Sequence, residues 1–292
     1  MDGSRSRHLS ELIALGHDVR LMPPAYVKPY VKRGKTDAAD AEAICEAVTR
    51  PIMRFVPVKS REQQALMSLH RTRSLLVKQR TQSVNMMRGL LAEFGINIPG
   101  GLERALLLAR QIVVGESPDV PAVAITMVSM LAQQALDTHS RLQEIDRKLC
   151  ALQQSDEIAK RLATIPGIGP VGATALAAAV TDPGQFRSGR QFAAWLGLTP
   201  LQNSSGGKER LGKISKMGDK YLRRLLVIGA TSLVRRARHK PETADPRLVG
   251  LLARKPVRMA TVAMANKMAR IAWAIMTRGE VYQRSHAPML AG

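Results

Sequence analysis

Two aspartates spaced for one face of a helix are the first candidates for chemistry. Asp37 and Asp40 lie three residues apart in an Ala-rich segment. On a helix that spacing puts both carboxylates on one side, and hard cations such as Mg²⁺ take oxygen ligands of this kind. A structural role is the alternative, with Asp37 capping the helix and Asp40 in its first turn, where the helix dipole favours negative charge. Spacing alone favours this structural interpretation.

A serine pair beside two glycines is the second candidate. Ser204 and Ser205 directly precede Gly206-Gly207, and a serine next to glycine is sterically open, as a nucleophile must be. The cations that follow could stabilise the charge of a phosphoryl transition state; they are Lys208, Arg210, Lys213 and Lys216. Composition alone favours a flexible Ser/Gly linker. Neither a Ser/His/Asp order nor a metal-ligand spacing among the six histidines is evident.

The third candidate is a glycine-rich turn, Ile165-Pro-Gly-Ile-Gly-Pro-Val-Gly. An apolar residue, a Gly-x-Gly turn and a following helix are typical of the helix–hairpin–helix. Gly167 and Gly169 would let backbone N–H groups approach a phosphate closely, which positions a duplex without reading its bases. A tight turn capped by glycine is the structural alternative. The basic segment just downstream favours phosphate binding.

The charge of the chain supports a polyanion as partner. The 292 residues carry a formal net charge of +21. Residues 201–292 hold 19 Lys and Arg against 5 Asp and Glu, which is 14 of those 21 charges. Such a basic third beside a neutral middle indicates a binding face for nucleic acid. Aromatic residues are only 3%, which argues against modules that stack bases on aromatic platforms.

The sequence also predicts where the chain resides. Cys45 and Cys150 are its two cysteines, too few for a disulfide framework and suited to a reducing cytoplasm. An apolar run long enough to span a membrane is absent from the sequence, and its start lacks the features of a secretory signal. We therefore expect a cytoplasmic, nucleoid-associated protein.

The elements that would position these residues are mostly helices, arranged in three regions. Residues 1–60 are predicted to be the C-terminal part of an α/β domain, with a helix stopped by Gly16, a helix from Thr36 or Asp37 to Pro51, and short strands at 18–22 and 54–58. Parallel strands need neighbours, so the missing strands either precede this segment or come from a partner chain.

Residues 61–160 are predicted to hold long helices. One covers 62–94, a shorter one covers 102–114, and another follows Pro121. The last carries a coiled-coil seam of Leu142, Ile145, Leu149 and Leu152, so the long helices are expected to pair as an antiparallel stalk or across a dimer.

Residues 161–292 are predicted to form a helical C-terminal domain. Helices are expected up to Val180 and over 190–196, 221–238 and 257–276. Arg223 and Arg224 are expected on or beside the polar face of the third of these, among the cations that contact DNA.

Together these motifs resemble the DEDD transposases of the IS110 family of bacterial insertion sequences. The resemblance covers almost the whole chain, in the family's order. It is carried by Lys35-Thr-Asp-Ala-Ala-Asp-Ala-Glu-Ala-Ile-Cys, Arg54-Phe-Val-Pro-Val-Lys, Ile165-Pro-Gly-Ile-Gly-Pro, Phe192-Ala-Ala-Trp-Leu-Gly-Leu-Thr-Pro, Asn203-Ser-Ser-Gly-Gly and Met217-Gly-Asp-Lys-Tyr-Leu-Arg-Arg-Leu-Leu.

The resemblance implies an RuvC-like (RNase H-type) domain, a coiled-coil insert and a C-terminal transposase domain with a helix–hairpin–helix. It implies DNA recombination by phosphodiester transfer with Mg²⁺, guided by a structured RNA and carried out by an oligomer. Asp37 and Asp40 match the last two acids of the family's quartet. Ser205 matches the nucleophile, and Ser204 is the near competitor.

One departure from the family is expected to affect activity. The first Asp and the Glu of the quartet would both precede Met1, and two carboxylates should hold Mg²⁺ far more weakly than four. The hypothesis is a truncated transposase with little or no strand-transfer activity. It leaves three alternatives: an intact enzyme whose start is misplaced, a relic that still binds DNA or RNA, and an unrelated basic helical protein such as a nucleoid or ribosome-associated factor.

Overall fold

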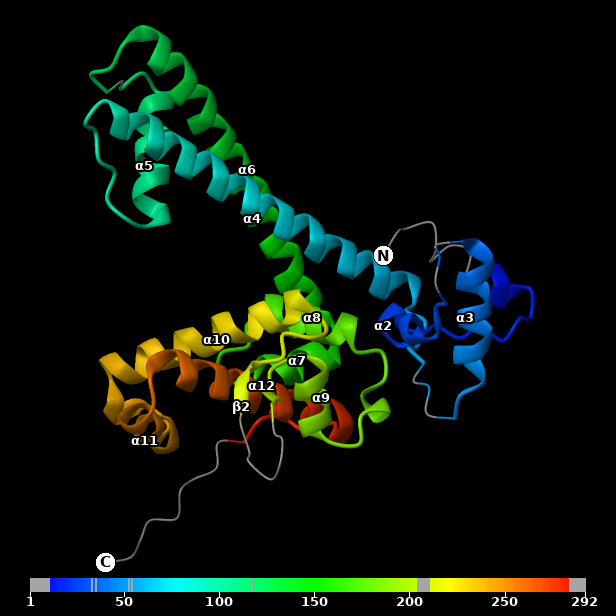
Figure 1. Ribbon diagram of the computed structural model, residues 1–292. Coiled ribbons are helices and arrows are strands. Elements are labelled where there is room, and N and C mark those ends of the chain that lie inside the picture. Colours follow the sequence, from blue (N-terminus) through cyan, green and yellow to red (C-terminus); the bar gives the residue numbers. More distant parts are fainter. Residues whose placement is uncertain are drawn as a thin grey trace, which may run out of the picture. The chain divides into compact units, whose positions relative to one another are not determined.

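A computed structural model describes residues 11–32, 34, 36–51, 53, 55–116, 118–203 and 211–283. The chain divides into two compact units, Met1–Glu62 and Gln63–Gly292. Nearly all regular structure is helical, and the described residues form a single two-stranded sheet (Figure 1). The prediction of a mostly helical chain is confirmed. None of the described helices has the length and hydropathy needed to cross a membrane.

The first unit is built on one well-formed helix, α3 (Asp37–Thr49). Before it come the short α2 (Pro24–Val27) and the 3₁₀ turn η1 (Lys28–Tyr30), and residues 11–14 are helical up to Gly16, which has a φ of +86°. That φ suits glycine, and the predicted stop at Gly16 is confirmed.

The prediction of short strands at 18–22 and 54–58 is wrong for the described residues of this unit. Leu21 and Val56 form an isolated antiparallel bridge, in which the Val56 amide donates to the Leu21 carbonyl at 2.7 Å. A lone pair of residues has no further strands to extend the ladder, so a sheet does not develop.

The second unit begins with a pair of long antiparallel helices. The pair is α4 (Arg61–Glu93), which belongs to this unit from Gln63 onward, and α6 (Ala122–Ser155), with α5 (Leu102–Val113) packed between their far ends (Figure 1). Buried Met87, Leu91, Leu106 and Ala132 lie at that end. Pairing within one chain confirms the predicted antiparallel stalk. Three seam residues, Leu142, Ile145 and Leu149, are buried, whereas Leu152 is 40% exposed.

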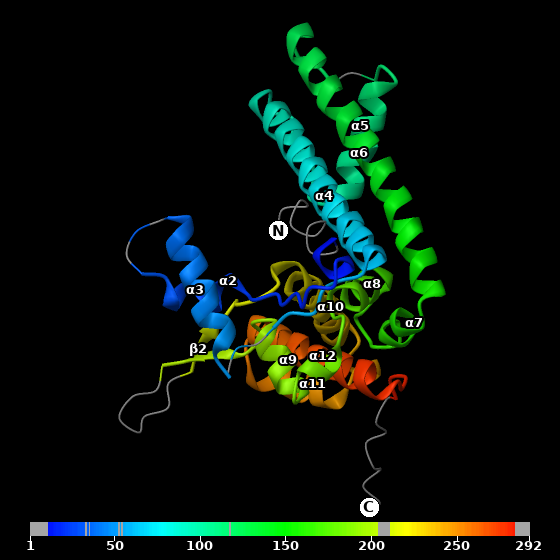
Figure 2. The same ribbon diagram turned by 90° about the vertical axis from the view of Figure 1, so that its right-hand side faces the viewer.

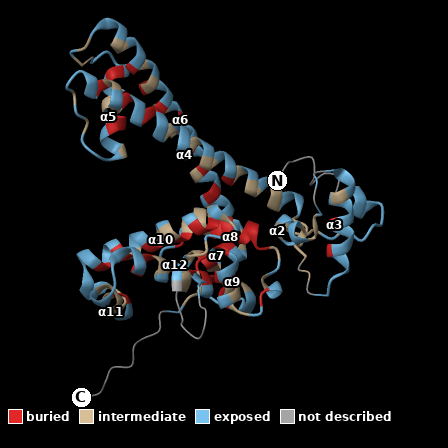
Figure 3. Cartoon of the chain, in the orientation of Figure 1, coloured by how far each residue is buried: buried red, intermediate tan, exposed pale blue. Residues whose placement is uncertain are grey.

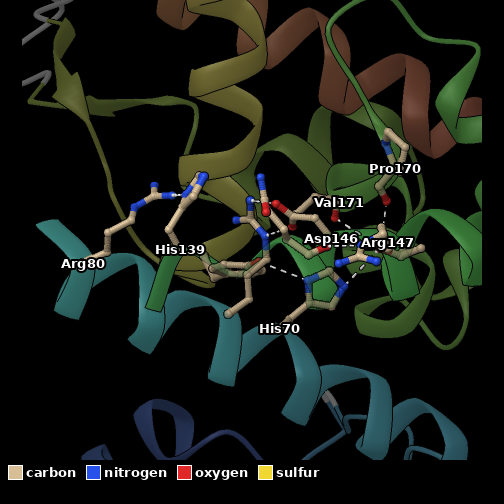
Figure 4. Close-up of polar contacts among 11 residues, drawn as sticks. His70, Arg80, His139, Asp146, Arg147, Pro170 and Val171 are labelled. Carbon is tan, nitrogen blue, oxygen red and sulfur yellow. Dashed lines mark hydrogen bonds and ion pairs between the residues drawn. The ribbon is translucent and has the colours of Figure 1, made fainter. Parts of the chain in front are cut away.

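A polar layer joins the base of this stalk to the helices below it. Arg73 of α4 donates from Nε and Nη2 to both carboxylate oxygens of Asp146 on α6, at 2.5 and 3.3 Å. About two helical turns further along α4, Arg80 points toward His139, with Nη1 3.0 Å from Nδ1 (Figure 4). Arg73 and Arg80 therefore lie on the face of α4 that is turned toward α6.

A buried histidine completes the layer. His70 lies 3.0 Å from the hydroxyl of Tyr221 through Nδ1 and 3.2 Å from Thr174 through Nε2. Burial, and to a lesser extent the nearby Arg73 cation, together lower the pKa of His70 to about 4. Burial also raises the pKa of Tyr221. His70 is thus a neutral ring that fixes α4 onto two helices of the body.

The body is a bundle of short and medium helices around one core. Its helices are α7 (Glu157–Ala163), α8 (Pro170–Ala179), α9 (Gly189–Trp195), α10 (Lys220–His239), α11 (Pro246–Arg254) and α12 (Val257–Arg278), with the 3₁₀ turns η2 (Pro183–Gln185) and η3 (Pro241–Thr243). Buried residues gather where α7, α8, α9 and α12 meet (Figure 3). The predicted helices α8, α9, α10 and α12 are confirmed, whereas α11 was not expected.

Candidate functional site

The segment predicted as a Ser/Gly linker is flanked by a β-hairpin. β1 (Pro200–Gln202) and β2 (Leu211–Ile214) pair antiparallel, with Pro200 opposite Ile214 and Gln202 opposite Leu211. The hairpin extends away from the helical body (Figure 2). Ser204, Ser205, Lys208 and Arg210 lie outside the described residues. The predicted Ser/Gly linker therefore lies outside the described residues, and the described residues on both sides of it belong to the two paired strands, called the hairpin arm below.

The base of the hairpin is held by two glycines that bring backbones into contact. Gly197 and Gly218 have φ values of +70° and +73°. A Cβ on Gly197 would lie 2.2 Å from the Met217 carbonyl oxygen, and one on Gly218 would lie 1.9 Å from the Trp195 carbonyl oxygen. Both positions therefore exclude any side chain. The strand roots are fixed to each other by direct backbone packing.

Arg223 strengthens the same junction from below. It is 9% exposed, and its Nη1 donates to the carbonyl oxygens of Leu196 at 2.9 Å and Met217 at 2.7 Å. Arg223 was expected on or beside the polar face of its helix as an accessible cation, but it lies beside that face and is buried. It stands next to Leu222 and one turn before Leu226, both buried, so its stem enters the core while its charged head satisfies two carbonyls. Its guanidinium supports the hairpin and is not presented to a ligand.

Other predicted cations of this segment are accessible. Lys213 on β2 and Lys216 at the hairpin base are exposed, and Lys216 has an unusual φ of +54°. Arg224 is also exposed; its Nη2 donates to Ser74 Oγ at 2.9 Å, and its guanidinium lies 5.3 Å from the centre of the Tyr221 ring. These three side chains present positive charge around the base of the hairpin.

The two glycines of the turn between α7 and α8 behave differently. Gly167 has a φ of +86°, and a Cβ there would lie 3.0 Å from the Gly229 carbonyl oxygen of α10. Gly169 precedes α8 with a φ of −88°, and a Cβ there would meet nothing within 4 Å. Gly167 is therefore required by packing, whereas the open space above Gly169 leaves the N-terminus of α8 accessible.

Asp37 and Asp40 lie in the first turn of α3, and both are exposed. Thr36, not Asp37, caps the helix, with its Oγ1 accepting from the Ala39 amide at 3.2 Å. The structural interpretation in which Asp37 caps the helix is therefore wrong, and the Asp37 carboxylate remains available to bind a ligand. In the described part of the chain these two acids belong to no group of three or more His, Cys, Asp or Glu side chains that could hold a metal. As a ligand pair they have the right donor chemistry for Mg²⁺ in combination with phosphate oxygens and water.

Sequence reasoning missed two groups of residues in the second unit. The buried layer around His70 joins segments about a hundred residues or more apart, for which spacing gives no signal. A second group, Arg190, Arg247 and Arg270, lines one cleft between α9, α11 and α12. The high basic content after residue 200 covers Arg247 and Arg270 but not Arg190, and it does not show that the three lie together.

Comparison with known proteins identifies relatives over nearly the whole chain. The family model for DEDD transposases of IS110 matches residues 2–96, and the model described as "Transposase IS116/IS110/IS902 family" matches residues 159–245. A relative named as a transposase in Sinorhizobium fredii is 46% identical over 282 residues, covering 96% of this chain and 72% of that protein. A family 20 transposase of Pseudomonas aeruginosa is 48% identical, covering 96% and 83%. The transposase for insertion sequence element IS1328 of Yersinia enterocolitica is 41% identical, covering 96% and 82%.

Proposed function

Because this chain belongs to the IS110/IS116 family of insertion-sequence transposases, we propose that it transfers DNA strands through a serine nucleophile, Ser205. Family membership overturns the alternative of an unrelated nucleoid or ribosome-associated factor. The observation that carries the proposal is the hairpin arm, whose strands flank Ser205 and whose base is fixed by Gly197, Gly218 and Arg223. A nucleophile must be held at a set place, and a rigid base supplies that.

The chemistry is a two-step exchange at phosphorus. The Ser205 Oγ forms a bond to phosphorus while the bond from phosphorus to one sugar oxygen breaks, and that oxygen leaves as a hydroxyl carrying the serine proton. A hydroxyl of a second strand then attacks the phosphoserine, which returns the proton to Ser205. The exposed cations Lys213 and Lys216 would stabilise negative charge that develops on the phosphate.

Asp37 and Asp40 would hold the Mg²⁺ that the family resemblance implies. Both carboxylates are exposed in the first turn of α3, and neither is used to cap that helix. Mg²⁺ is commonly held by one or two carboxylates together with substrate phosphates and water. When bound, the ion supplies charge neutralisation at the scissile phosphate.

The finer domain assignments follow from the same family. The first unit would be part of an RuvC-like domain, and α7, its glycine turn and α8 would act as a helix–hairpin–helix on the DNA backbone. Gly169 is the residue of the turn with open space above it, so it is the one proposed to approach phosphate. Gly167 supports the turn from inside.

The partners proposed are DNA, a structured guide RNA and further copies of this chain. The charge on residues 201–292, 19 basic against 5 acidic, supports a nucleic-acid partner of either kind. Delegating sequence recognition to a guide RNA agrees with the scarcity of aromatic residues, which are 3% of the chain.

A strand-transfer assay tests the proposal. The full chain is incubated with plasmid DNA carrying the element's ends, RNA transcribed from the element, and Mg²⁺. Recombinant junctions are expected with wild type and with Ser204→Ala, and not with Ser205→Ala. Junctions formed by Ser205→Ala would contradict the serine assignment. Nucleic-acid binding without junctions in wild type would favour the alternative function, a binding protein without catalysis.

A further inference from the structure

The second unit contains a positively charged cleft away from the hairpin. It lies between α9, α11 and α12, has a volume of about 900 Å³, and is defined here by Arg190, Arg247, Leu248, Lys267, Arg270 and Trp273. That volume is in the range of clefts that bind ligands. The residues come from three helices separated in sequence, so the cleft is a product of the tertiary fold.

Its rim carries three arginines with no carboxylate partner in the part of the chain that the structure describes. Arg190, Arg247 and Arg270 are all exposed, and none of them forms an ion pair there. Gly189 packs its Cα against the backbone of Arg270, where a Cβ would lie 3.1 Å from the carbonyl oxygen. This close approach fixes the start of α9, and with it Arg190, beside Arg270.

The acid of the cleft is already neutralised. Asp245 accepts from Lys267 Nζ at 2.9 Å through Oδ2, and from the Arg247 amide at 2.9 Å through Oδ1. That pair leaves the three guanidinium groups as the net charge of the cleft. Guanidinium groups have the geometry that recognises phosphate oxygens.

The floor of the cleft is apolar. Leu248 is buried, and Met264, Ile271 and Trp273 line the cleft beside it. A double helix presents only its charged backbone to a protein surface unless a groove is entered, whereas an unpaired strand also exposes the faces of its bases. A cationic rim over an apolar floor therefore suits an unpaired strand better than a duplex.

The cleft continues toward the glycine turn. A smaller cavity of about 280 Å³ shares Asp245, Arg247 and Lys267 with it and reaches Ile165 and Pro166 of the turn, with Arg236 adding a further cation. A strand that contacts the turn can therefore pass into the cleft without leaving the protein surface.

We propose that the cleft between α9, α11 and α12 binds an unpaired nucleic-acid strand, with Arg190, Arg247 and Arg270 on its phosphates. This inference rests on the proposed function only in that the ligand is nucleic acid, and strand binding in the cleft does not require Ser205 to react. DNA and RNA strands share the phosphodiester chemistry, and the experiment separates them.

The test measures binding of labelled oligonucleotides of about 12 residues to the full chain by fluorescence anisotropy, over a series of salt concentrations. The probes are single-stranded DNA, single-stranded RNA and a duplex of the same sequence. The triple variant Arg190→Gln, Arg247→Gln, Arg270→Gln is compared with a control that removes three exposed arginines of the stalk, Arg104→Gln, Arg110→Gln and Arg141→Gln.

The cleft variant should bind at least one single-stranded probe about tenfold more weakly or worse, with a log–log salt slope shallower by about 2, since each phosphate contact on a single strand contributes about 0.7. Its duplex binding should change no more than that of the control variant. Whichever of DNA and RNA loses more affinity identifies the strand. Equal losses in cleft and control variants would overturn the proposal, whereas a wild type that binds no probe would count against the proposed function as well.

A second readout places the strand in the cleft. Trp195 and Trp273 are the two tryptophans of the chain, so Trp195→Phe leaves Trp273 as a reporter on the cleft wall. The single-stranded probe should change the fluorescence of this variant, and the change should vanish when the three arginines are also replaced. A change that persists without them would contradict the assignment of the three arginines to the phosphates of the strand. Circular dichroism verifies that each variant keeps the wild-type helix content.

Discussion

Replacing Arg223 by methionine is expected to loosen the base of the hairpin arm. The substitution keeps the apolar stem but removes the Nη1 group that donates to the Leu196 and Met217 carbonyl oxygens at 2.9 and 2.7 Å. Both carbonyls would be left without this donor in a place where Arg223 itself is 9% exposed.

The expected loss follows from these two bonds. A hydrogen bond from a charged donor contributes about 1.5 to 3 kcal/mol. Because one nitrogen donates to both carbonyl oxygens, each bond should contribute about 1.5 kcal/mol, so Arg223→Met should lower the free energy of unfolding by about 3 kcal/mol. In a unit of this size that corresponds to a fall of roughly 6 to 12 °C in Tm.

Urea denaturation of the full chain, followed by fluorescence of Trp195 and Trp273, measures the loss. Arg224→Met is the matched control, because the neighbouring arginine is exposed and makes one hydrogen bond, to Ser74, and a ring contact with Tyr221. It should cost under about 1 kcal/mol. Equal losses of unfolding free energy in the two variants would refute the supporting role of Arg223. A smaller loss in Arg223→Lys than in Arg223→Met would support it.

Three further predictions concern the buried histidine, the glycine turn and the aspartates. Wild type should lose about 3 kcal/mol of stability as the pH falls from about 6.5 to about 4, because His70 takes up a proton in the unfolded state but not in the folded state. The urea midpoint of His70→Gln should lack this part of the pH dependence, and an identical pH dependence of the midpoint in wild type and variant would contradict the prediction. Gly167→Ala should lower the Tm by several degrees because of its φ of +86° and its contact with α10, whereas Gly169→Ala should leave the Tm unchanged. Similar shifts in Tm for both variants would contradict the assignment of Gly167 to packing and of Gly169 to open space. Asp37→Asn and Asp40→Asn should each raise the Mg²⁺ concentration needed for half-maximal strand transfer, and an unchanged requirement would remove these residues from the metal site.

The helical part of this fold could be predicted from periodicity. The apolar positions of α6 recur every three to four residues, and Leu142, Ile145 and Leu149 are indeed buried. Helix ends were also readable, since Gly16 adopts the φ of +86° that a stop requires. Such features depend on residues within one or two turns of each other, which a sequence displays directly.

The hairpin and its support could not be predicted in this way. Gly197 and Gly218 are twenty-one positions apart, and their meaning lies in a backbone contact made only in the folded chain. Arg223 carries the charge of a surface residue, yet it is one position from buried Leu222, so its burial depends on the carbonyls that it satisfies. Residue type and local spacing record neither fact.

The candidate site could likewise be predicted only in part. Serine beside glycine, paired aspartates and a basic C-terminal third were all visible as residue types. Which cations face solvent was not: Lys213, Lys216 and Arg224 are exposed while Arg223 is buried. The cleft between α9, α11 and α12 was also hidden, because its arginines come from three helices whose packing brings them to one rim.

The role of Ser205 as the nucleophile can be tested by identifying the residue that becomes joined to DNA. The full chain would be reacted with DNA carrying the element's ends in the presence of its RNA and Mg²⁺, quenched in denaturant, digested with nuclease and protease, and analysed by mass spectrometry. We expect a nucleotide attached to Ser205, absent in Ser205→Ala and retained in Ser204→Ala. Attachment at another residue, or recombinant DNA formed without any protein-linked strand, would contradict it.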